Sequence, residues 1–90
     1  METEKYIKTI EAVYFDGVTN VEQIAQWCGG SVVEILDQNG QIRRDIYAID
    51  VPVNGDQFVT AGKDFYIFND QQFFFALPAS EFLSMFSKSE

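Results

Sequence analysis

The chain has 90 residues, with 14 acidic and 6 basic side chains, no histidine, one cysteine and nine phenylalanines. Imidazole carries most acid–base catalysis near neutral pH, and most metal sites need His or Cys, so the usual catalytic and metal-binding residues are largely absent. The formal net charge of −8 repels phosphate backbones and disfavours direct nucleic-acid binding. We therefore predict a protein that is not an enzyme and that needs no metal or cofactor.

The first strand is predicted over Tyr6–Phe15, where β-branched and aromatic residues are frequent. A short helix of nine or ten residues follows. Thr19 stands three residues before Glu22, which is the spacing of a capping box. The Gly29–Gly30 pair predicts the end of this helix, because glycine readily adopts the left-handed conformation of a helix cap.

The middle of the chain predicts a succession of strands and tight turns. Asn39-Gly40 is a strong hairpin signal, since both residues tolerate positive φ. The predicted strands and turns are, in chain order, strand Val32–Leu36, turn Asp37–Gly40, strand Gln41–Val53, turn Asn54–Gly55, strand Gln57–Ala61, turn Gly62–Lys63, strand Asp64–Phe68 and turn Asn69–Asp70.

The last predicted strand, Gln71–Leu77, contains three consecutive phenylalanines and therefore places aromatic rings on both faces. A closing helix is predicted over Pro78–Phe86, with Phe82, Met85 and Phe86 on one face. The second face of the last strand needs cover from this helix or from a partner chain, and the shortness of the chain slightly favours a homodimer.

Together these elements predict one compact α+β domain over residues 1–90, with frayed ends at 1–5 and 87–90. We expect a small antiparallel β-meander or partly open barrel of about six strands. One helix follows the first strand and a short helix ends the chain.

The acidic, polar amino terminus is unlike a signal peptide, and no apolar run approaches the roughly 18 residues of a membrane span. With a single cysteine, these features favour a reducing cytoplasm and no membrane partner.

Four segments resemble a family of small phage and prophage proteins of uncharacterised role: KTIEAVYFDG (8–17), IAQWCGGSV (24–32), IDVPVNG (49–55) and AGKDFYIF (61–68). The family pattern runs VEAVQF-G, -EWCGG, VPTLEG and PGDW-I. This sequence departs from it at Lys63, which separates Gly62 from Asp64. The resemblance implies a phage or prophage context in the host cytoplasm and carries over no catalytic residue.

The leading hypothesis is an accessory protein that binds and inhibits a host or anti-phage defence protein by direct contact. The acidity of the chain would favour a partner with a basic surface. In one version of this hypothesis, the protein mimics the negative charge of DNA. Trp27 is the first candidate for a contact hot spot if it is exposed, and a core residue otherwise. Cys28 is expected to be a buried small hydrophobe, because it lies at the helix end that disfavours a thiolate.

Two alternatives remain. A sponge for a small nucleotide signal would hold it in an aromatic pocket between protomers and bind its anionic group with Arg43, Arg44 or Lys63. A base would then stack on an aromatic ring, for which the candidates are Tyr66, Phe68 and Phe74. The simpler interpretation of the arginines is that they flank a hairpin and pair with Asp37 or Asp45. The other alternative is a minor component of the virion.

Overall fold

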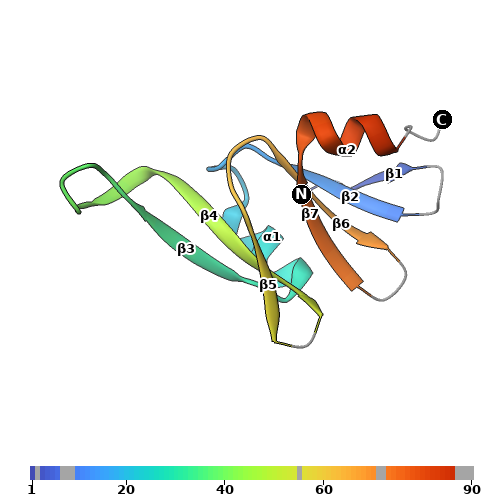
Figure 1. Ribbon diagram of the computed structural model, residues 1–90, viewed down its shortest axis with the longest axis horizontal. Coiled ribbons are helices and arrows are strands. Elements are labelled where there is room, and N and C mark those ends of the chain that lie inside the picture. The colour runs from blue at the N-terminus through green and yellow to red at the C-terminus, as the bar shows by residue number, and fades with distance from the viewer. Residues whose placement is uncertain (2, 7–9, 55, 71–72, 87–90) are drawn as a thin grey trace.

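The computed structural model describes residues 1, 3–6, 10–54, 56–70 and 73–86. Its elements are arranged as two antiparallel sheets and two helices (Figure 1). Their bounds are β1 Glu4–Tyr6, β2 Ile10–Phe15, α1 Val21–Cys28, β3 Ser31–Leu36, β4 Ile42–Asn54, β5 Gln57–Ala61, β6 Phe65–Asp70, β7 Phe73–Pro78 and α2 Ala79–Met85.

The α+β class predicted from the sequence is confirmed, but the single meander is wrong. One sheet has four strands in the order β1-β2-β6-β7, and the other has three in the order β3-β4-β5. The meander breaks between β5 and β6, because β6 pairs with β2 and β7 and not with β5, the strand that precedes it. Asp64, at φ 66°, turns the chain there and donates its N–H to the carbonyl of Phe15.

Two predicted boundaries also differ. The predicted first strand, Tyr6–Phe15, corresponds to β2 and to Tyr6 at the end of β1, so α1 follows the second strand; residues 7–9 lie outside the described residues. Asn69 and Asp70 do not form the predicted turn but end β6, where they pair with Phe74 and Phe73. Glu4 and Lys5 belong to β1, within the stretch predicted to fray, and 87–90 lie outside the described residues.

The predicted hairpin at Asn39-Gly40 is confirmed. The Asp37 carboxylate accepts hydrogen bonds from the N–H groups of Asn39 and Gln41, at 2.8 and 2.9 Å, and Gly40 has φ 79°. This β3–β4 hairpin projects away from the rest of the molecule (Figure 1) and accounts for the elongated extents of 44 × 27 × 22 Å.

Helix α1 ends as predicted but begins differently. Gly29 has φ 70° and donates to the carbonyl of Gln26, while Gly30 donates to that of Ala25. The predicted capping box is wrong, because the N-cap is Asn20 and no side chain caps this end. The Asp16 carboxylate instead holds the preceding loop, where it accepts the N–H groups of Val18 and Thr19.

The main core lies between the two sheets and α1. Side chains of β2 and β6 contact α1 and the apolar face of β4, and no buried polar side chain lies within the described part of the chain. The buried members of this cluster are Val13, Phe15, Ile24, Ala25, Cys28, Ile49, Val51, Val53, Ala61, Ile67 and Ala76.

Gly30 is the tightest glycine in this core, and we predict that Gly30→Ala destabilises the fold. A Cβ at this position would overlap the backbone carbonyl oxygen of Asp50, which belongs to β4 and cannot move without disturbing the sheet. Such overpacking costs about 1–3 kcal/mol. Gly62→Ala is the control, because its Cβ would meet nothing within 4 Å. Urea unfolding of both variants checks this, and equal midpoints would contradict it.

Asp16 should stabilise the loop before α1 only while it is ionised. The N–H groups of Thr19 and Val18 hold the pKa of Asp16 below its ordinary value of 3.8. A carboxyl with a lowered folded-state pKa stabilises the fold above its unfolded pKa and loses that effect as pH falls through the folded value. We expect Asp16→Ala to cost about 0.5–2 kcal/mol at pH 7, as for other loop and cap hydrogen bonds.

Urea unfolding at a series of pH values tests this, because the difference between wild type and Asp16→Ala should shrink as pH falls below 3.8. A difference that stays constant down to the pH of acid unfolding would assign the effect to something other than the ionised carboxylate.

Candidate functional site

The outer face of the four-stranded sheet, turned away from the main core, is unusually aromatic. Strand register places Phe68 opposite Phe75 and Tyr66 opposite Leu77, so these four side chains share one face. Ile10 and Ala12 of β2 extend that face, and both are buried. The sheet is therefore apolar on both sides.

Helix α2 covers part of this outer face through Phe82, whose exposed fraction is 0%. The Phe82 ring stacks on Tyr66, with centroids 4.4 Å apart and an interplanar angle of 17°, and lies 5.2 Å from Phe68. Phe86 packs against Phe82 and Phe68 at 4.9 and 5.5 Å. At the other end of the helix, Ala79 donates its N–H to the carbonyl of Asp64. These contacts fix α2 over one end of the sheet (Figure 1).

Helix α2 is too short to cover the rest of the outer face. Its seven residues span about 10 Å, whereas the six residues of β6 span about 20 Å. A groove of about 310 Å³ remains where α2 ends above β6 and β7. Its lining residues are Phe68, Asp70, Phe75, Leu77, Met85 and Phe86. We call this the α2–β7 groove.

Large apolar side chains remain exposed in and beside the α2–β7 groove. Phe75 and Met85 line it and expose 42% and 64% of their surface. Phe73, two residues before Phe75 on β7, exposes 51% of its surface. Aromatic residues and methionine are enriched in the buried centres of protein interfaces, and contiguous apolar patches mark such sites. The geometry fits binding of an apolar segment.

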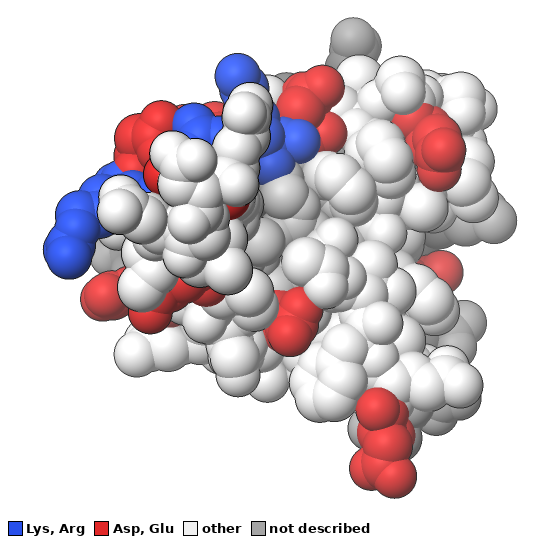
Figure 2. All heavy atoms as spheres, turned by 60° about the vertical axis from the view of Figure 1, so that its left-hand side comes forward, with Lys and Arg blue, Asp and Glu red and all other residues white. Residues whose placement is uncertain are grey.

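Charge is distributed unevenly around this site. Asp70 lines the groove and Glu81 lies exposed on α2. Arg43 and Arg44 lie in β4, near the tip of the β3–β4 hairpin, and Lys63 lies in the loop before β6, whereas Asp70 ends that strand. On the face drawn in Figure 2, the basic side chains of the described residues gather at one side, with acidic ones between them. The groove is thus apolar with an acidic flank.

The aromatic candidates from the sequence fall on both faces of the four-stranded sheet. Trp27 is half-buried on α1 and meets Phe74 edge to face, with centroids 5.0 Å apart and an interplanar angle of 79°. Phe68 exposes only 5% of its surface, and Tyr66 is half-buried under Phe82. Of these candidates, only Phe68 lines the α2–β7 groove.

The basic candidates lie elsewhere. Arg43 forms the expected surface pair with Asp45, at 2.6 Å between Nη2 and Oδ2, and the Arg44 carbonyl accepts the hydroxyl of Tyr47. Lys63 is exposed in the loop before β6. The arginines lie in the three-stranded sheet, whereas the three candidate stacking rings lie in the four-stranded sheet.

Cys28 is buried, as predicted. Its thiol lies 3.5 Å from the carbonyl of Ala25, and burial raises the pKa of the Cys28 thiol. A raised pKa disfavours the thiolate that reacts as a nucleophile.

In the described part of the chain, no group of three or more His, Cys, Asp or Glu side chains is placed to hold a metal ion.

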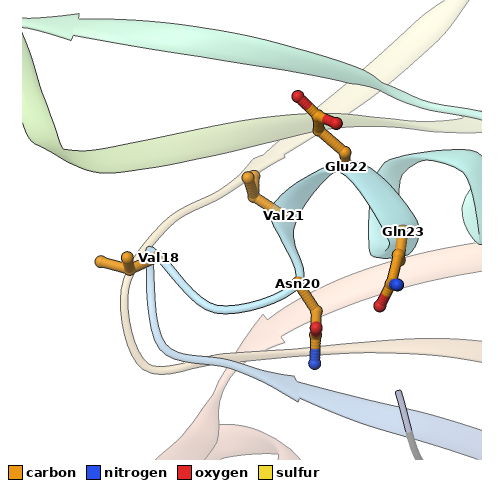
Figure 3. Close-up of a pocket in the computed structure, with 5 residues that line it drawn as sticks. All are labelled: Val18, Asn20, Val21, Glu22 and Gln23. Atoms are coloured by element: carbon orange, nitrogen blue, oxygen red, sulfur yellow. The ribbon is translucent and has the colours of Figure 1, made fainter.

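A second hollow of about 290 Å³ lies at the start of α1 (Figure 3). Its five lining residues are Val18, Asn20, Val21, Glu22 and Gln23. The side chains of Glu22 and Gln23 point in different directions and do not converge (Figure 3). With an acidic side chain and no basic one in its lining, this hollow lacks the features of an anion site.

Comparison with protein-family models, curated proteins and solved structures finds no match for the chain. Among the helices of the described residues, none is both long and apolar enough to cross a membrane.

The sequence pointed to the elements of the groove but not to its residues. The run of three phenylalanines signalled rings on both faces, and Phe73 and Phe75 do lie on the face opposite Phe74. Met85 was grouped with Phe82 on one helix face, yet Phe82 is fully buried and Met85 is mostly exposed. Exposure here depends on where α2 ends above the sheet, which helical periodicity does not specify.

Phe82 should be the main contact that holds α2 in place. We predict that Phe82→Ala lowers the free energy of unfolding by about 3–5 kcal/mol, as expected for a buried phenylalanine. The neighbouring Leu83→Ala should change it by less than about 0.5 kcal/mol, since Leu83 is exposed. Chemical denaturation of the two variants distinguishes them, and similar losses of stability would contradict the assigned role of Phe82.

Proposed function

We propose that this protein is a non-enzymatic phage or prophage accessory protein, acting in the host cytoplasm, that binds a host or anti-phage defence protein and inhibits it by direct contact. The observation that carries the binding function is the α2–β7 groove, where Phe75 and Met85 remain exposed beside the buried ring of Phe68. The phage context comes from the sequence motifs, above all Trp27-Cys28-Gly29-Gly30 after Phe15–Gly17.

The size of the chain suits this role. A stable interface buries about 800 Å² on each partner. That is about an eighth of the 6071 Å² accessible surface of this chain. The groove and the exposed Phe73 of β7 supply an apolar centre, and Asp70 and Glu81 supply an acidic flank. Inhibition then requires only that the bound chain cover a surface that the partner needs for its own activity.

Capture of the partner should depend on the groove. We expect the double substitution Phe75→Ser and Met85→Ser to reduce, by at least about tenfold, the amount of partner that tagged protein retains from host lysate, because interface anchors each contribute about 2 kcal/mol or more. Both side chains are already exposed, so the fold should survive. Quantitative mass spectrometry of the eluates provides the measurement.

Leu36→Ser is the matched control for this capture, because Leu36 is equally apolar and 59% exposed but lies at the far end of the β3–β4 hairpin. It should retain the partner fully. A partner retained by the groove variant and lost by Leu36→Ser would move the contact site to the hairpin. If wild type, the groove variant and Leu36→Ser all retain the same proteins in equal amounts, the proposed function is contradicted.

A further inference from the structure

We infer that the occupant of the α2–β7 groove is an amphipathic helix of the partner protein that carries a basic residue at the position facing Asp70. This inference rests on the proposed function and specifies the partner's chemistry. The helix would lie beside α2 on the outer face of the sheet, with its apolar side against Phe75 and Met85.

The first argument is the space on the sheet. A helix has a diameter of about 10–12 Å and covers about two strands, which lie about 4.8 Å apart. Helix α2 is only seven residues long and packs through Phe82 on Tyr66 and Phe68 of β6, so the end of the β6–β7 hairpin that carries Phe73 lacks a covering element among the described residues. Layers of helix on sheet are the usual way to bury such a face. One further helix fits this requirement.

The second argument concerns the alternative of an added strand. β7 is the terminal strand of its sheet, but it also contacts β4 and β5 of the other sheet. An incoming strand would have to enter between the two sheets to pair with β7. A helix needs only the open outer face, where the groove lies. The position of β7 therefore favours a helix as the occupant.

The third argument is charge. Within the described residues, the Asp70 carboxylate has no ion-pair or hydrogen-bond partner, and the ion pair found there joins Arg43 and Asp45. Asp70 is half-buried in the wall of an apolar groove, where an unpaired carboxylate becomes costly once a partner excludes water. A lysine or arginine of the partner would remove that cost. The net charge of −8 also speeds the approach of a basic segment.

Two synthetic peptides test this inference. Both are 18-residue amphipathic helices with the same leucine face; one carries Lys and Arg on its flanks, and the other carries Glu. Fluorescence anisotropy with intact wild-type protein should show the basic peptide binding at least tenfold more tightly than the acidic one. Met85→Ser should weaken the basic peptide at least fivefold, since it removes an apolar wall of the groove.

Charge variants give the sharper readout. Asp70→Asn should weaken the basic peptide about fivefold to tenfold, and Asp70→Lys should reduce or invert the preference between the peptides. Glu34→Gln changes the net charge equally at an exposed position of β3 and should change the affinity less than twofold. Equal effects of Asp70→Asn and Glu34→Gln would overturn the pairing with Asp70, because binding would then follow net charge alone.

Failure of the inference is distinguishable from failure of the proposed function. If partner capture depends on Phe75 and Met85 but the basic peptide has no advantage, the inference is wrong and the proposed function stands. Sedimentation could instead show that wild-type protein self-associates and that both Met85→Ser and Leu36→Ser abolish the self-association. The groove would then hold the β3–β4 hairpin of a second copy, and the inference would again be wrong. A basic-peptide advantage that Asp70→Asn removes supports it.

Discussion

The four-stranded sheet must bury apolar side chains on both of its faces, because residues alternate between the faces and the strands β2, β6 and β7 carry few polar ones. On the inner face, α1 and the second sheet complete the main core. On the outer face, only α2 is available among the described elements, and it is held there by the stacked rings of Phe82 and Tyr66. Both the topology and the candidate site follow from this requirement.

The α2–β7 groove is the part of the outer face that α2 does not reach. The same aromatic cluster that fixes α2 also provides one wall of the groove, since Phe68 and Phe86 belong to both. This explains how a small chain with few catalytic side chains can still present a defined site. The site is made from core-type residues left accessible, and the half-buried Asp70 adds one carboxylate to its lining.

The elements with local signals were predictable from the sequence. The turn at Asn39-Gly40 and the end of α1 at Gly29–Gly30 depend on backbone conformations that these residues favour, and both were confirmed. The pairing of β2 with β6 was not predictable, because it joins segments about 50 residues apart and no local pattern encodes that contact. The start of α1 was misjudged because Asp16, three residues before Thr19, holds the loop in place of the capping box.

The sequence predicted the type of site, a contact surface, but not most of the residues that form it. Aromatic excess and acidity predicted a contact surface, and Phe68 was the one proposed residue that lines the groove. Phe75 and Met85 were missed because their exposure depends on the length and placement of α2. The same placement buries Phe82, which lies one helical turn before Met85.

The most direct test of the central claim, that the α2–β7 groove is the contact site, is amide hydrogen exchange of the protein alone and in complex with its captured partner. We predict that binding slows exchange in β7 and α2, over Phe73–Met85, and leaves the β3–β4 hairpin unchanged. Slower exchange confined to the hairpin, with β7 and α2 unaffected, would contradict the claim and place the contact at the opposite end of the molecule.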